Sequence, residues 1–165
     1  MNVRYRADSS QASRAPEAAT LRYSPKELTA CTLLTTMINS QPDITSEAAI
    51  RLLVDGFYVK VVEDALLGPV FNGFAHVDWP HHLPVMYDFW SSLLLGTTRY
   101  HGRPFPKHLP LPIAAAHFQR WLALFEATVN EHFAGPKAEE AKARARGIAT
   151  LFEHRLHERN PFALM

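Results

Sequence analysis

Residues 104–112 read Pro-Phe-Pro-Lys-His-Leu-Pro-Leu-Pro, so four prolines fall within nine positions. Each proline fixes its own φ, lacks an N–H and pushes the preceding residue toward extended conformations. A long regular helix cannot pass through this stretch, and we expect a stiff, non-helical strap. The strap carries one imidazole, His108, between apolar neighbours. Taken alone, such a residue is more simply an exposed loop histidine, although imidazole is also a good ligand for iron.

Outside the strap, apolar residues recur at steps of three and four, which is typical of amphipathic helices. The clearest helix is expected over residues 47–62, with Ser46 as its N-cap. Further helices are expected over residues 79–95 and 113–133, and from Pro136 onward. Residues 67–73 are expected to form a turn that buries Phe71. No segment alternates with period two, so the sequence predicts an all-α fold without a sheet.

The first part of the chain differs in composition from the rest. Residues 1–44 are rich in Ser, Ala, Thr and Arg, which predicts a flexible extension with one short helix over residues 27–39. Residues 45–165 then form one helical domain. In this domain the strap is a longer connection than helical bundles normally use, and long connections in compact domains are usually functional.

Composition excludes several classes of function. The formal net charge of +1 gives no footprint for nucleic acid. The apolar runs are too short to cross a membrane, no signal peptide is expected, and a single cysteine fits a reducing cytoplasm. The nine histidines raise interest in a metal or cofactor, but they lack the spacing and the cysteine partners of a zinc site.

Three polar donors lie on otherwise apolar helix faces. Tyr58 is on the first predicted helix, His82 on the second and Trp121 on the third. Each alone can simply donate to a backbone carbonyl, as buried donors usually do. Together with the imidazole of His108, they favour a shared apolar cavity for a flat, metal-bearing group. Haem fits this description, with His108 as its axial ligand.

The order and spacing of the aromatics and prolines are also familiar. The matching residues are Phe57-Tyr58, the run 67–71, Trp79 with His82, the run 89–92, Leu95-Gly96, Tyr100, Gly102, Pro104, the run 108–112, Phe118, Trp121-Leu122 and Leu124-Phe125. Over about residues 46–156, this chain resembles the group III truncated haemoglobins. Like members of that group, it lacks the Gly-Gly signatures of other truncated haemoglobins.

This resemblance implies a shortened two-over-two helical globin fold that binds haem b. It places the proximal iron ligand at His108 and the distal residues at Tyr58, His82 and Trp121. Phe71 takes the position of the phenylalanine that wedges the haem ring. The remaining residues that we expect to line the haem pocket are all apolar: Phe57, Met86, Phe89, Trp90, Leu109, Leu111 and Phe118.

Three functions from different classes remain open at this stage. The first is a haem protein that binds dioxygen, carbon monoxide or nitric oxide, with or without turnover by an external reductase. The second is a peroxidase-like or other redox haem enzyme, since polar distal residues also polarise peroxide. The third is a cofactor-free helical interaction module, in which the inward donors are ordinary core groups.

Overall fold

The computed structural model describes residues 41–159, which are helical with no strand. The elements in chain order are the α-helix α2 (Glu47–Glu63), the π-helix η1 (Pro69–Phe74), the α-helix α3 (Trp79–Leu95), the 3-10 helix η2 (Phe105–His108) and the α-helices α4 (Ala115–His132) and α5 (Pro136–Arg159). The all-α prediction is confirmed. The short helix predicted over residues 27–39 lies outside the described residues. None of the described helices is both long and apolar enough to cross a membrane.

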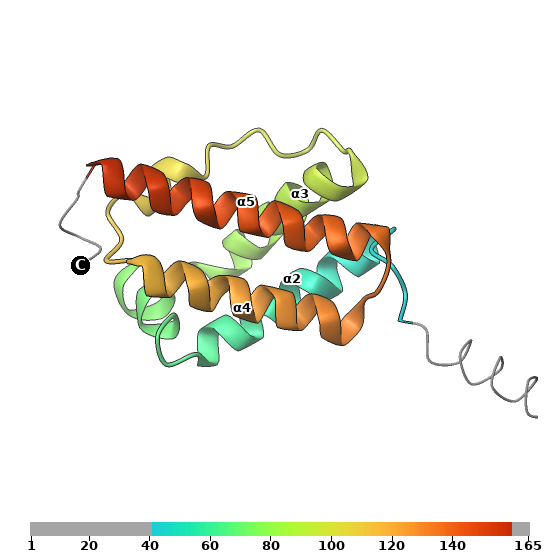
Figure 1. Ribbon diagram of the computed structural model, residues 1–165, viewed down its shortest axis with the longest axis horizontal. Coiled ribbons are helices and arrows are strands. Elements are labelled where there is room, and N and C mark those ends of the chain that lie inside the picture. Colours follow the sequence, from blue (N-terminus) through green and yellow to red (C-terminus); the bar gives the residue numbers. More distant parts are fainter. Residues whose placement is uncertain (1–40, 160–165) are drawn as a thin grey trace, which may run out of the picture. The chain divides into compact units, whose positions relative to one another are not determined.

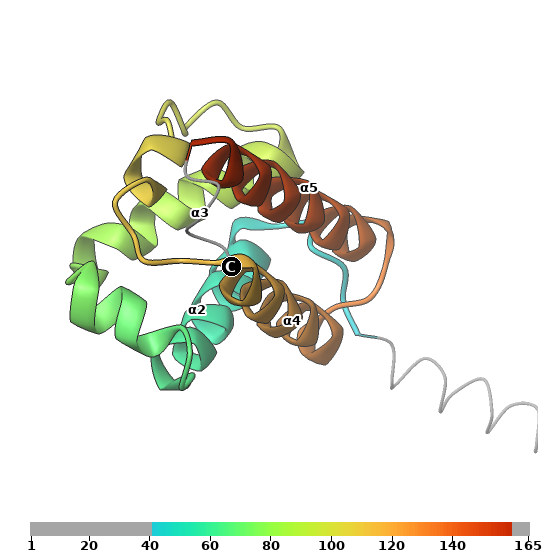
Figure 2. The same ribbon diagram turned by 60° about the vertical axis from the view of Figure 1, so that its left-hand side comes forward.

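The four long helices pack as two pairs. Helix α4 runs alongside α5, and α2 packs against both α3 and α4, while α3 also contacts α5 (Figures 1 and 2). The connection from α3 to α4 passes along the outside of α5 in both views. This arrangement is the two-over-two helical globin fold that the sequence predicted.

Helix α2 begins and ends where its side chains satisfy the backbone. The Ser46 hydroxyl accepts a hydrogen bond from the Ala49 N–H at 3.2 Å, so Ser46 is the predicted N-cap. Just beyond the helix, the Asp64 carboxylate accepts the N–H groups of Leu66 and Leu67, both at 3.0 Å. These bonds turn the chain sharply and direct it into η1.

The segment predicted as a turn is instead a π-helix over Pro69–Phe74. Pro69 can start a helix because the first helical N–H needs no partner. A Cβ on Gly68 would lie 2.7 Å from the Val62 carbonyl oxygen, so the close approach of η1 to the end of α2 requires glycine here. The prediction for Phe71 was also wrong, since this side chain is half-buried and Val70 is the buried residue.

The strap differs from its prediction in one respect. Residues 97–114 form a long connection, but its centre is the 3-10 helix Phe105–His108 rather than extended chain. A single turn tolerates Pro104 and Pro106 because both stand at its start, where no backbone N–H is required. His108 therefore stands at the end of a helical turn.

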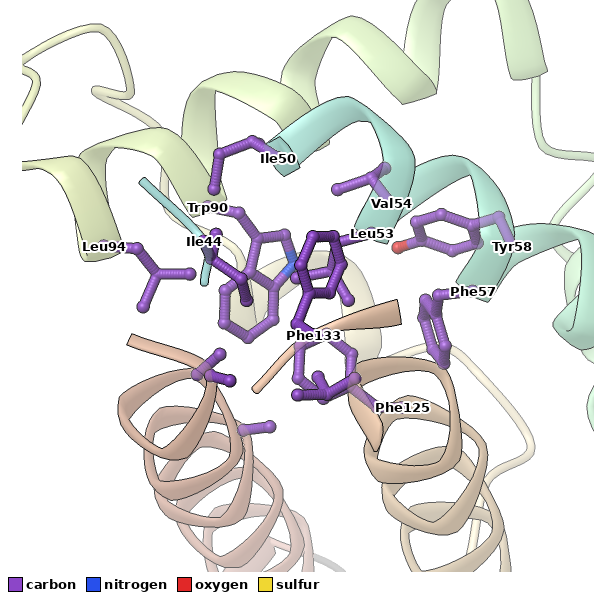
Figure 3. Packing of buried hydrophobic residues seen from close by; sticks show 14 of the residues in the cluster. Ile44, Ile50, Leu53, Val54, Phe57, Tyr58, Trp90, Leu94, Phe125 and Phe133 are labelled. Carbon is purple, nitrogen blue, oxygen red and sulfur yellow. The ribbon is translucent and has the colours of Figure 1, made fainter. Parts of the chain in front are cut away.

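Most buried apolar side chains belong to one core between α2, α3, α4 and α5 (Figure 3). Trp90 stacks on Phe125 at 4.6 Å between ring centroids, and Phe125 stacks on Trp121 at 5.5 Å. Tyr58 lies at the edge of this core, next to Phe57. A second, smaller cluster joins α4, α5 and the strap through Phe118, Ala149 and Phe152.

The chain ahead of α2 is bonded to the corner between α4 and α5. The Asp43 carboxylate accepts the N–H groups of Lys137 at 3.0 Å and Ala138 at 2.8 Å, so it caps the first turn of α5. Ile44 is fully buried in the main core. Gly135 has a φ of +135°, and a Cβ there would lie 2.5 Å from the Asp43 carboxyl carbon. Both the backbone angle and the space at this corner therefore require glycine.

Candidate haem site

Tyr58 and His82 come from different helices and meet in one hydrogen bond. Tyr58 is buried on the inner face of α2, and its hydroxyl oxygen lies 3.2 Å from His82 Nε2. Burial raises the pKa of Tyr58, so its hydroxyl keeps its proton. The two rings are perpendicular, with centroids 5.3 Å apart. The structure therefore presents a neutral phenol and an imidazole as a single polar unit.

The environment of His82 keeps its imidazole neutral. Burial lowers the pKa of His82, and the positive charge of Lys107 lowers it further. Lys107 belongs to the strap, so the strap contributes to the electrostatic environment of His82. A neutral His82 can accept the Tyr58 O–H at Nε2.

Two more aromatic rings surround this pair. Trp79, the first residue of α3, lies 5.5 Å from the Tyr58 ring and 5.8 Å from the His82 ring, between centroids. Trp79 also stacks on Phe71 at 6.1 Å with 15° between the ring planes. Its indole N–H donates to the Asn72 side-chain oxygen at 3.2 Å. The polar pair thus stands in an aromatic wall built by α2, η1 and α3.

Trp121 lies on the inner face of α4 beside the same core. Its indole stacks on Phe125 and is perpendicular to Phe57 at 5.4 Å, while Phe57 in turn contacts Tyr58 at 4.9 Å. Within residues 41–159, the structure gives the Trp121 N–H no hydrogen-bond acceptor. Neither Tyr58 nor Trp121 donates to a backbone carbonyl of the described chain. The structure therefore does not support the alternative that these two donors are ordinary core groups bonded to the backbone.

His108 is held by a bond to its own turn. Its Nδ1 lies 2.8 Å from the Pro104 carbonyl oxygen, which can only accept, so Nδ1 carries the proton. Burial lowers the pKa of His108, although the Pro104 bond opposes that shift. The ring also packs against Phe152 of α5 at 4.9 Å. The result is a neutral imidazole of fixed orientation, with its Nε2 lone pair available to a metal.

The expected pocket-lining residues fall into two groups. Phe57 and Trp90 are almost fully covered by the main core, and Phe118 is buried in the smaller cluster. The others remain half-buried despite their size: Phe71, Met86, Phe89, Leu109 and Leu111. Large apolar side chains that stay partly uncovered suit a flat apolar group that would cover them.

The donors present fit haem better than a bare metal ion. Within residues 41–159, no three His, Cys, Asp or Glu side chains are grouped closely enough to hold a metal. One oriented imidazole, His108, suits an iron whose other ligands come from a macrocycle. A polar pair and an indole N–H, at Tyr58, His82 and Trp121, suit a small ligand on that iron.

Sequence reasoning missed three contributors to this site. Trp79 was noticed as a matching residue but given no role, and Asn72 and Phe152 were not considered as site residues. Aromatic residues at the first position of α3 and on the inner face of α5 were visible in the sequence. Their contacts with His82 and His108 depend on how helices meet, which periodicity does not contain.

The fold is that of a shortened helical globin in which a proline-rich strap carries His108. Residues 42–156 match the family described as bacterial-like globin. The chain is also 35% identical over 117 residues to the group 3 truncated hemoglobin ctb of Campylobacter jejuni, covering 68% of this chain and 92% of that protein. The crystal structure of the group III truncated hemoglobin from Campylobacter jejuni superposes with a TM-score of 0.63 at 34% identity, over 70% of this chain and 94% of that one. The chain therefore belongs to the bacterial-like globin family and, within it, to the group III truncated haemoglobins.

Proposed function

We propose that this protein binds haem b through His108 and holds a diatomic ligand with Tyr58, His82 and Trp121. The observation that carries the proposal is the bond from His108 Nδ1–H to the Pro104 carbonyl oxygen, 2.8 Å long. This bond fixes the tautomer and makes Nε2 more basic, which is what an axial ligand requires. When bound, the haem supplies an iron with a coordination position for dioxygen, carbon monoxide or nitric oxide.

Tyr58 and Trp121 are the donors in this proposal. Each offers a proton from a buried or half-buried group, and Trp121 has no competing acceptor in the described chain. A small ligand that gains negative charge on binding is stabilised by such donors, at roughly 1.5–3 kcal/mol for each charge-assisted hydrogen bond. Two such bonds would slow release by several orders of magnitude, since each 1.4 kcal/mol is about tenfold. Slow release favours chemistry or tight sensing over transport.

His82 has a different role from the two donors. As a neutral imidazole 3.2 Å from the Tyr58 hydroxyl, it can accept a hydrogen bond from that hydroxyl and so competes with any ligand for it. Its ring also occupies space at the start of α3, close to the strap. We infer that His82 controls how easily a ligand reaches Tyr58.

An absorption spectrum tests the proposal directly. We expect the protein to take up haem and show a Soret band that shifts when the ferrous form is exposed to carbon monoxide. In this test the His108→Ala variant should lose the Soret band. His101→Ala is its matched control, because His101 is an exposed histidine of the same connection, residues 97–114. A protein that shows no Soret band after haem addition would instead be the cofactor-free interaction module.

Peroxide chemistry is the second candidate, favoured by the neutral imidazole of His82. A neutral histidine near a bound peroxide can take up a proton from it, which is general base catalysis. Turnover with peroxide, compared with the rates of dioxygen and carbon monoxide binding, separates the two functions. Rapid turnover that falls in a His82→Leu variant would favour the peroxidase.

An external reductase in a reducing cytoplasm completes the proposed function. An iron that is oxidised during ligand chemistry needs electrons to return to the ferrous state. We therefore include an external reductase as the electron donor. Reduction of the ferric protein by cell extract of its own source, followed by fractionation, would identify the donor.

A further inference from the structure

The beginning of α3, which carries His82, contains two prolines and lacks a side-chain cap. Pro80 and Pro84 both lack an N–H, and the ring of Pro84 crowds the carbonyl of the residue four positions earlier. Asp78 provides no side-chain cap for this helix. The N–H groups of His81 and His82 both bond to the Asp78 carbonyl oxygen, at 3.1 and 2.8 Å. Backbone bonding alone therefore leaves this turn loosely fixed.

The loop before α3 does not hold the turn either. His76 has a φ of +47°, a left-handed conformation that costs energy for a residue other than glycine. In this loop the Ala75 N–H donates to the Val70 carbonyl oxygen at 2.8 Å and the Val77 N–H to the Phe71 carbonyl oxygen at 3.0 Å, so both bonds run back to η1 and not to the first turn of α3. The side chains must therefore supply the rest of the constraint.

Trp79 is the side chain that supplies it. Its indole N–H donates to Asn72, and its ring stacks on Phe71, so both anchors lie in η1. The same ring lies 5.5 Å from the Tyr58 ring and 5.8 Å from the His82 ring, between centroids. Trp79 thus connects the π-helix to both members of the polar pair, and π-helices frequently occur at functional sites.

We propose that Trp79 is the positioning residue of the distal site: anchored to η1 by Asn72 and Phe71, it holds His82 against the Tyr58 hydroxyl. When the anchor is lost, His82 leaves Tyr58 and a ligand reaches the pocket more easily. This inference deepens the proposed function, and its consequence for ligand binding depends on that function. The position of His82 does not depend on that function, because the contacts that hold it are all made by protein side chains.

Two variants remove the anchor in different ways. Asn72→Leu removes the acceptor and keeps the indole, whereas Trp79→Phe keeps an aromatic ring and removes the N–H. Because both delete the same hydrogen bond, the double variant should behave like either single variant rather than like their sum. Thr128→Ala is the control for a general loss of stability. Thr128 is fully buried on α4, where its hydroxyl donates to the Leu124 carbonyl oxygen, and it is not part of the cluster of Phe71, Trp79, Tyr58 and His82.

The first readout is the pKa of His82, which is measured by NMR titration of the imidazole in the haem-free protein. Burial lowers the pKa of His82 in the native site. A ring released into water should therefore titrate closer to the ordinary histidine value in Asn72→Leu and Trp79→Phe, and not in Thr128→Ala. The second readout is carbon monoxide association after flash photolysis of the ferrous protein. Loss of one hydrogen bond should raise that rate roughly two- to tenfold.

The two readouts distinguish the outcomes. A pKa of His82 and an association rate that both stay at wild-type values in Asn72→Leu would overturn the inference and leave Trp79 as ordinary packing. Asn72→Leu keeps the whole aromatic cluster, so it remains informative even if Trp79→Phe does not fold. A wild-type protein that takes up no haem would refute the proposed function, yet the His82 titration would still decide the role of Trp79.

Discussion

Tyr58 on α2 and His82 on α3 share a hydrogen bond of 3.2 Å across a separation of 24 residues in the sequence. The bond gives the Tyr58 hydroxyl a partner within the protein itself. A ligand that is bonded by Tyr58 must therefore compete with His82 for this hydroxyl. The affinity for a ligand depends on the difference in free energy between the Tyr58–ligand and the Tyr58–His82 hydrogen bonds. Because His82 lies on α3, this difference links the packing of α2 against α3 to ligand binding.

We expect Tyr58→Phe to speed dioxygen release by roughly ten- to a hundredfold, because one charge-assisted hydrogen bond is lost. Carbon monoxide release should hardly change, since carbon monoxide builds up little charge on binding. Stopped-flow displacement of each ligand measures both rates. Equal acceleration for the two ligands would show that the shape of the pocket, and not the hydroxyl, is responsible.

Trp121→Phe should also speed dioxygen release selectively, because the indole N–H has no acceptor within the described residues and is open to a ligand. The replacement keeps an aromatic ring to stack on Phe125, so the core should be little disturbed. Tyr58 and Trp121 would share one ligand, and the double variant need not show the sum of the two effects. An unchanged dioxygen rate in Trp121→Phe would remove Trp121 from the site.

Much of the helical framework could be predicted because it depends on local chemistry. Ser46 caps α2 as expected, and Gly96 ends α3 in a left-handed conformation with a φ of 71°. The π-helix η1 was missed because Gly, Pro and Asn indicate a turn equally well. The 3-10 turn before His108 was missed because prolines exclude long helices but not a single turn.

The site shows a similar division. The types of residue at positions 58, 82, 108 and 121 suggested the haem chemistry that we propose, and the resemblance to a globin family gave each an expected role. The sequence did not indicate that Tyr58 and His82 bond to each other, or that Trp79 packs against both. These contacts arise from the angle at which α2 and α3 meet, and no single stretch of sequence contains that angle.

We expect His108→Ala to lose haem during gel filtration, because the axial bond is the main directional contact of the protein with the iron. Added imidazole should partly restore the spectrum by occupying the vacated space. The Phe152 ring remains to border that space on one side. His101→Ala should retain haem like the wild type. A His108→Ala protein with the wild-type ferrous spectrum and no added imidazole would show that another histidine is the ligand.

Asp43→Ala should lower the free energy of unfolding by about 1–2 kcal/mol, the usual effect of removing a helix cap. Burial opposes ionisation of Asp43, but hydrogen bonds from the N–H groups of Lys137, Ile44 and Ala138 outweigh it, and the pKa is lowered. A carboxyl whose folded pKa is depressed stabilises the protein above its unfolded pKa of about 3.9 and stops doing so as pH falls through the folded value.

The difference in stability between wild type and Asp43→Asn should therefore shrink as the pH falls below about 4. Asparagine is the appropriate comparison because it keeps an acceptor for the α5 N–H groups and lacks the charge. Urea unfolding at several pH values measures the difference. A gap that is constant from neutral to acidic pH would show that the charge of Asp43 contributes nothing to the cap.

A protein that begins at Met37 should fold and bind haem normally, because the proposed site residues all lie downstream. It also keeps the contacts of residues 41–44, in which Gln41 donates to the Asn130 and Glu131 carbonyl oxygens and Asp43 caps α5. A protein that begins at Thr45 is the matched control. It loses the cap and the fully buried Ile44, whose burial contributes about 1.5–3 kcal/mol, and should melt at a lower temperature. If the protein that begins at Met37 is itself colourless or insoluble, residues 1–36 are part of the folded domain and the proposed boundary is wrong.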